Sequence, residues 1–145
     1  MPSETFSHTV DIDVPTATAW AALQDPDIWS SIGPVSSVSN PAYRDDGTLA
    51  SFDWVADIGG KKYDGAAIGG DYVINEEYTL TLDTSEIAGD VIATLDGTAD
   101  TTSVTIEITF RTKGMLSAMF FPAIKQALAS GFPGQVEDIA ASIQN

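Results

Sequence analysis

Residues 20 to 34 read WAALQDPDIWSSIGP, and this stretch holds two of the three tryptophans in the 145-residue chain. A helix turns by about 100° per residue, so one continuous helix would point Trp20 and Trp29 to roughly opposite faces. Asp25-Pro26 prevents this, because the residue before a proline avoids helical geometry, while Asp and Pro suit the cap and first position of a new helix. The sequence therefore predicts two short helices with a corner between them, which turns both indole rings toward one interior.

Strands are expected on both sides of this corner. From Thr5 to Val14 apolar and polar residues alternate, Pro15 ends the run, and Thr16 is expected to cap the first helix. After Pro34 the period of two returns, weakest in the glycine-rich stretch 61–74, and Pro41 is expected to interrupt the first of these strands. The candidate strands are 35–43, 49–58, 61–74, 78–83, 87–95 and 104–111. Short turns join them without any helical pattern, which predicts an antiparallel meander with one apolar face.

From Gly114 onward the apolar spacing changes to three and four residues, which is the period of a helix. The stripe consists of Leu116, Phe120, Ile124, Leu128, Phe132, Val136, Ile139 or Ala140, and Ile143. It keeps its phase through Pro122 and Pro133, so we expect one long helix across the sheet, kinked at the prolines or broken near Gly131.

The composition disfavours several classes of function. With 21 acidic and 6 basic residues the net charge is −15, which makes nucleic acids and anionic membranes unfavourable partners. The chain has no cysteine and one histidine, so we expect no metal site and no cofactor. No apolar run approaches the roughly 18 residues of a membrane span, and no secretion signal is evident. We expect a single domain, 1–145, in the cytoplasm, without stable membrane insertion; nothing in the sequence bears on the oligomeric state.

Two segments carry a resemblance to a known superfamily. FSHTVDIDVPTATAWAALQDPDIWSSIGPVSSV at 6–38 resembles the opening of START-like (SRPBCC) proteins, and GMLSAMFFPAIKQAL at 114–128 resembles the start of their long helix. Within the superfamily, the resemblance is strongest to small bacterial proteins of the polyketide cyclase/dehydrase type and of the carbon-monoxide-dehydrogenase accessory type. It implies an α+β helix-grip fold, as in START domains and pollen allergens. In that fold a curved antiparallel sheet wraps around a long C-terminal helix, with two short helices after the first strand.

The resemblance also implies a cavity between the sheet and the long helix, and the apolar parities of the strands place side chains on its wall. The expected ligand-binding residues are His8, Trp29, Trp54, Tyr78, Phe110, Phe120, Ile124 and Leu128. Ordinary core packing is the alternative for each of them; Trp29 is expected either at the cavity mouth or in the core, and Trp20 in the core. Tyr63, Tyr72 and Tyr78 each offer a phenol to a polar ligand group, and alternation directs only Tyr78 inward.

Three functions from different classes stay open. The first is a carrier or sensor of a small hydrophobic molecule, such as a lipid, an isoprenoid or a polyketide-like aromatic. The second is a polyketide cyclase or dehydratase in which His8 or a tyrosine moves a proton, and the third is a protein-interaction or assembly factor. Most carboxylates alternate away from the apolar faces, which leaves Asp64 as the best acidic candidate. The sequence therefore favours binding over catalysis, and we assign no catalytic residue.

Overall fold

The computed structural model describes residues 3–30, 32, 35–58, 60–113 and 115–144, without the side chains at 58, 115–118, 120, 124 and 127. The elements in chain order are β1 (Ser3–Ile12), α1 (Thr16–Leu23), the 3-10 helix η1 (Pro26–Trp29), β2 (Val35–Tyr43), β3 (Leu49–Ile58), β4 (Lys61–Val73), β5 (Glu77–Thr84), β6 (Ile87–Gly97), β7 (Thr102–Thr112) and α2 (Met115–Gln144). No helix in these ranges is long and apolar enough to cross a membrane.

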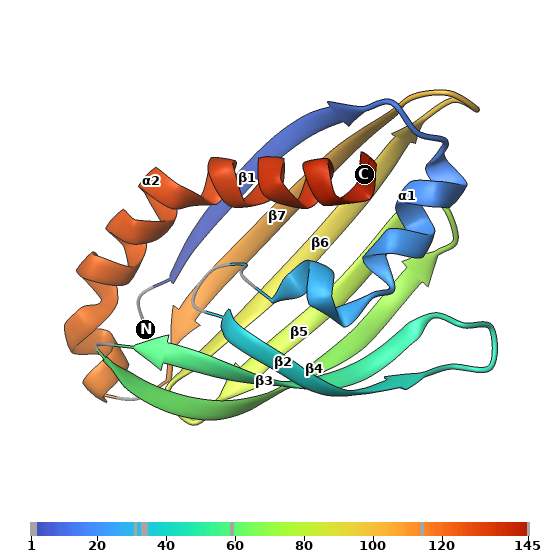
Figure 1. Cartoon of the computed structure of the whole chain (residues 1–145). Helices are drawn as coiled ribbons and strands as arrows, with labels where there is room; N and C mark the ends of the chain where they lie inside the picture. The colour runs from blue at the N-terminus through green and yellow to red at the C-terminus, as the bar shows by residue number, and fades with distance from the viewer. Residues whose placement is uncertain (1–2, 31, 33–34, 59, 114, 145) are drawn as a thin grey trace.

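The strands form one seven-stranded antiparallel sheet in the order β1-β7-β6-β5-β4-β3-β2. The first strand lies beside the last one, and β1 and β7 pair without a register shift from Ser3↔Arg111 to Ile12↔Thr102. Figure 1 shows α2 lying across one face of this curved sheet, with α1 at one end. We call the face toward α2 the inner face; it carries the buried side chains of the core. The predicted α+β helix-grip arrangement is therefore confirmed.

The corner after β1 forms as the sequence predicts. Asp25 caps η1, because its carboxylate accepts a hydrogen bond from the Asp27 amide at 3.0 Å, and Pro26 occupies the first turn. Both tryptophans turn inward and contact the Tyr78 ring, at centroid distances of 6.1 Å for Trp20 and 6.4 Å for Trp29. The second helix ends at Trp29, and the expected closing pair Gly33-Pro34 lies outside the described residues.

Of two local expectations about caps and prolines, the first needs correction. The cap of α1 is Pro15, not Thr16, since the Pro15 carbonyl already accepts from the amides of Thr18 and Ala19. Pro41 interrupts β2 as expected, because the register with β3 shifts between Ser39 and Ala42, although the strand continues to Tyr43. Because β2 is an edge strand, a proline can lie there without removing a hydrogen bond from the sheet.

Helix α2 is continuous through both of its prolines and through Gly131, so the expected break near Gly131 is absent. The helix bends along its length instead, as Figure 1 shows. Its second half supplies the buried residues Phe132, Val136, Ile139, Ala140 and Ile143. This half closes the core over β1, where Phe132 lies 6.3 Å from the ring of Phe6.

The small residues of β4 make room for aromatic rings on its neighbours. A Cβ at position 65 would lie 2.6 Å from Trp54 Nε1, and one at position 69 would lie 3.2 Å from the Tyr78 hydroxyl. The Trp54 indole lies over Gly65 from β3, and the Tyr78 phenol lies over Gly69 from β5. Packing against these rings explains why β4 is rich in glycine and alternates poorly.

Candidate ligand site

Most of the predicted ligand residues lie in the interior between the sheet and the helices. Trp54, Tyr78, Phe110 and Leu128 are buried and belong to one continuous core. The side chains of Phe120 and Ile124 lie outside the described residues, although both positions belong to α2. The predicted apolar faces of β3, β5 and β7 are therefore correct, and contact of these residues with a ligand remains a prediction.

Trp29 lies inside the core and not at its rim. Its side chain is 0% exposed, and its indole nitrogen donates a hydrogen bond to the Leu23 carbonyl at 3.1 Å. The ring stacks on Tyr78 with an interplanar angle of 27°. Of the two expectations for Trp29, the structure shows core packing, because η1 is a single turn held against the sheet.

The three tyrosines singled out in the sequence differ in their hydrogen bonds. The buried Tyr78 hydroxyl donates to the Leu49 carbonyl at 2.8 Å, and the Tyr72 hydroxyl donates to Asp46 Oδ2 at 2.6 Å. Among the side-chain polar atoms buried in the described part of the chain, only Tyr63 Oη lacks a partner. Buried polar atoms in native proteins are almost always paired, so this phenol is the exceptional group of the interior.

Burial raises the pKa of Tyr78 from 10.0 to about 12, with the nearby Arg44 opposing the shift. Since the folded state holds this proton more tightly, its contribution to stability is complete below pH 10 and is lost as pH rises from 10 to 12. We expect Tyr78→Phe to be less stable than wild type by about 1 kcal/mol at neutral pH, because it loses one hydrogen bond. Urea unfolding at increasing pH should show the stability difference between wild type and Tyr78→Phe shrink and reach zero at about pH 11. A difference that stays constant with pH would contradict the raised pKa of Tyr78.

Tyr63 lies near the start of β4, on the same side of that strand as the buried Ala67. It packs against the core and sits opposite Ala56 of β3. In Figure 1 this end of β3 and β4 lies near the first half of α2, and α2 contacts β3. Alternation in the sequence did not show which way Tyr63 points, because the next residues on the same side of β4 are the small Gly65 and Ala67. The one available indication was that Tyr63 and Ala67 are an even number of residues apart and therefore share a side of the strand.

His8 lies far across the sheet from Tyr63. It is on the α2 side of β1, its side chain is 30% exposed, and its Nε2 lies 3.8 Å from Glu137 Oε1 of α2. Strands β7, β6 and β5 separate β1 from β4. The structure therefore does not bring His8 and Tyr63 together as an acid–base pair.

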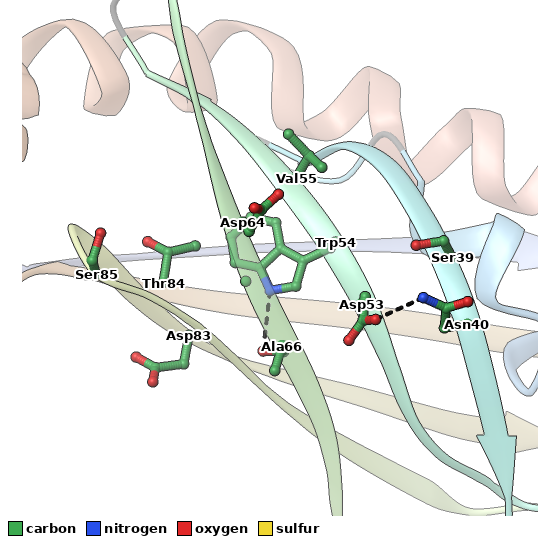
Figure 2. Close-up of a pocket in the computed structure, with 11 residues that line it drawn as sticks. Ser39, Asn40, Asp53, Trp54, Val55, Asp64, Ala66, Asp83, Thr84 and Ser85 are labelled. Carbon is green, nitrogen blue, oxygen red and sulfur yellow. Dashed lines mark hydrogen bonds between the residues drawn. The ribbon is translucent and has the colours of Figure 1, made fainter.

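Asp53 and Asp83 face outward as expected, and Asp64, the acidic candidate whose direction the sequence left open, is also exposed. The three aspartates line a hollow on the outer face of the sheet. Figure 2 shows this hollow, which has a volume of about 630 Å³ and is lined by Asp53, Asp64 and Asp83 together with Asn40. Asn40 Nδ2 donates to Asp53 Oδ2 at 2.9 Å. All three aspartates are exposed, and the described residues contain no cluster of three or more groups placed to hold a metal ion. The wall of the hollow also includes Trp54, Val55 and Ala66, so it is mixed in polarity. The three exposed carboxylates still make it a poor site for a wholly hydrophobic molecule.

No protein-family model and no curated protein matches this sequence. Solved structures do match: the Zhui aromatase/cyclase from Streptomyces sp. R1128 is 12% identical with a TM-score of 0.69, over 99% of this chain and 94% of that one. A START superfamily protein from Mycobacterium smegmatis is 15% identical with a TM-score of 0.62, over 93% and 98% of the two chains. This chain has the START/SRPBCC fold. Norcoclaurine synthase from Thalictrum flavum shares that fold at 10% identity and a TM-score of 0.58, over 98% of this chain and 87% of that one.

The START-like fold by itself does not select among the possible functions. Its members in this comparison include two proteins named for enzyme activities and one named only for its superfamily. Identities of 10 to 15% establish the shared fold and carry no residue roles across. The evidence that bears on function lies in the interior of this chain, where Tyr63 Oη is the buried side-chain polar atom without a partner among the described residues.

Proposed function

We propose that this protein binds a small hydrophobic molecule between the sheet and the first half of α2, as a carrier or sensor in the cytoplasm. The observation that carries the proposal is the Tyr63 hydroxyl, which is buried without a hydrogen-bond partner among the described residues. Leaving a buried hydroxyl unpaired costs about 1 to 3 kcal/mol. A polar atom on a bound molecule would remove that cost, so the orphan hydroxyl marks the place of the ligand.

The surroundings of Tyr63 favour an apolar ligand body. Tyr63 lies opposite Ala56 of β3, and Ala56 lies opposite Val35 of β2; both are buried and uncharged. Trp54, two residues before Ala56 on the same strand, is also buried. Pockets for small molecules typically combine such apolar walls with a few polar groups that fix orientation. The similar structures named for an aromatase/cyclase and a norcoclaurine synthase show that the fold accommodates proteins named for small-molecule reactions.

Binding is favoured over the cyclase or dehydratase alternative by the positions of the titratable groups. Asp64, the best acidic candidate from the sequence, is exposed on the outer hollow, and His8 lies on the other side of three strands. In the described parts of β3, β4 and β5, the carboxylates are exposed. General acid–base catalysis needs a group within hydrogen-bond reach of the reacting atom, and these positions do not supply one beside Tyr63.

The unpaired Tyr63 hydroxyl predicts that its removal stabilises the fold. In ligand-free protein, Tyr63→Phe is expected to raise the free energy of unfolding by about 1 kcal/mol, because it deletes a buried polar atom that has no partner among the described residues. Tyr78→Phe is the matched control, since it deletes a buried hydroxyl that donates to the Leu49 carbonyl, and it should lower stability. Urea unfolding of both variants checks the signs. Equal losses in the two variants would mean that Tyr63 has a partner in the folded chain.

Native mass spectrometry of gently purified protein tests the proposed function itself. We expect a mass above that of the chain alone, which returns to the chain mass after denaturing extraction. If the protein carries no adduct and also fails to bind an added naphthalene-sized hydrophobic probe at saturating concentration, the proposal is overturned.

A further inference from the structure

Lys61 differs from its neighbouring cations in having no carboxylate partner among the described residues. Four of the other cations form ion pairs: Lys62 with Asp57, Arg111 with Asp90, Lys113 with Asp83, and Lys125 with Glu4. Lys61 instead places its ammonium over the Tyr63 ring, 5.5 Å from the ring centroid. Arg44 also has no ion pair among the described residues and lies over a phenol, 4.6 Å from the Tyr72 ring centroid, but the Tyr72 hydroxyl donates to Asp46. The distinction of Lys61 is therefore that the phenol beneath it has no hydrogen-bond partner among the described residues.

A cation over the face of a phenol affects what its hydroxyl does. The ammonium interacts with the electron-rich face of the ring and draws electron density toward itself. The positive charge repels the hydroxyl proton, so it favours Tyr63 as a hydrogen-bond donor over an acceptor. The missing partner of Tyr63 Oη is then an acceptor atom, because a phenol that donates needs an oxygen or nitrogen lone pair opposite it.

The charge of that acceptor is limited by its surroundings. Burying an ion beside the apolar Trp54 and Ala56 would cost several kcal/mol unless it is well paired, and Lys61 is itself exposed to water. The net charge of −15 also repels anions from the protein as a whole. Both considerations favour an uncharged acceptor, of which a carbonyl oxygen is the strongest common type in hydrophobic molecules.

We infer that the ligand is an uncharged hydrophobic molecule with a carbonyl oxygen that accepts a hydrogen bond from Tyr63 Oη, while Lys61 holds the phenol as a donor. This inference rests on the proposed binding function and narrows it to a class of ligand. It also gives the ligand a direction, since Tyr63 and Lys61 place the carbonyl end near the start of β4.

Two probes of nearly equal shape test the inference, 2-acetonaphthone and 2-ethylnaphthalene, because they differ in the carbonyl. Their dissociation constants are measured by titration for wild type and for Tyr63→Phe. The carbonyl also changes the hydration of the free probe, so the informative quantity is the change in the ratio of the two constants between proteins. We expect Tyr63→Phe to weaken 2-acetonaphthone relative to 2-ethylnaphthalene by about tenfold, as the loss of one buried hydrogen bond predicts.

Lys61→Gln tests the role of the cation, and Lys62→Gln is its matched control. The two lysines are adjacent and exposed, but Lys62 pairs with Asp57, whereas Lys61 lies over the Tyr63 ring. We expect Lys61→Gln to shift the same ratio by about threefold, in line with the energy of an exposed cation–π contact, and Lys62→Gln to leave it unchanged.

The outcomes separate this inference from the proposed function. If both probes bind and Tyr63→Phe leaves their ratio unchanged, binding stands and the carbonyl inference is overturned. If 2-naphthoate binds more tightly than 2-acetonaphthone, and loses that advantage in Lys61→Gln, the ligand class is anionic and the inference is again overturned. If none of these probes binds wild type, the carbonyl inference is overturned, and the proposed function fails as well if native mass spectrometry also finds no adduct.

Discussion

Replacing Trp29 by alanine is expected to lower the free energy of unfolding by about 4 kcal/mol, near the middle of the range for buried tryptophan deletions. The side chain is 0% exposed, stacks on Tyr78 and donates to the Leu23 carbonyl, so its removal leaves a cavity and an unpaired acceptor. In a chain of this size, that loss corresponds to a fall in Tm of about 10 °C. Urea unfolding followed by circular dichroism measures it.

Trp29→Phe is the companion variant, because it keeps an aromatic ring and removes the indole nitrogen. Trp29→Phe should lower the free energy of unfolding by about 1 to 2 kcal/mol, because it loses the indole hydrogen bond and fills less volume. A loss below about 1 kcal/mol for Trp29→Ala would contradict core packing, since surface substitutions give values of that size. It would return Trp29 to the rim of the interior, as the other expectation from the sequence had it.

Gly65→Ala is expected to destabilise the fold by about 3 kcal/mol, at the upper end of the usual cost of overpacking. The added Cβ would lie 2.6 Å from the Asp83 carbonyl oxygen and 2.6 Å from Trp54 Nε1. The first neighbour is backbone in the middle of the sheet and cannot withdraw. The second is an indole held by its hydrogen bond to the Ala66 carbonyl at 3.1 Å, so it cannot move without loss.

Gly134→Ala is the matched control, since it makes the same chemical change where there is space. A Cβ at 134 meets nothing within 4 Å, and the residue lies inside α2. Alanine is a better helix former than glycine by about 0.5 to 1 kcal/mol, so this variant should be more stable than wild type. Thermal unfolding of the two variants should therefore shift in opposite directions. A Gly65→Ala protein as stable as wild type would mean that Trp54 does not lie over β4.

The parts of this structure that were predictable from sequence depend on local signals. Asp25-Pro26 specifies a helix start through backbone chemistry at two adjacent positions, and the corner forms accordingly. The apolar stripe of α2 keeps its phase through Pro122 and Pro133, and this predicted a single helix. The helix is indeed continuous through both prolines. Regular alternation likewise placed the inner face of β7 correctly.

The features that the sequence left open depend on partners distant in the chain. The direction of Tyr63 was hidden because β4 carries glycine where Trp54 and Tyr78 need room, and that requirement appears only when the strands are paired. The burial of Trp29 follows from its contact with Tyr78, far along the chain in β5. The orphan state of the Tyr63 hydroxyl is also a property of the assembled interior, which no alternation pattern encodes.

A crystal structure of the protein with bound 2-acetonaphthone tests the central claim most directly. We expect the probe between the sheet and the first half of α2, with its carbonyl oxygen about 2.8 Å from Tyr63 Oη. A probe found instead in the outer hollow beside Asp53 and Asp83, or an interior that stays empty at saturating probe, would contradict the claim.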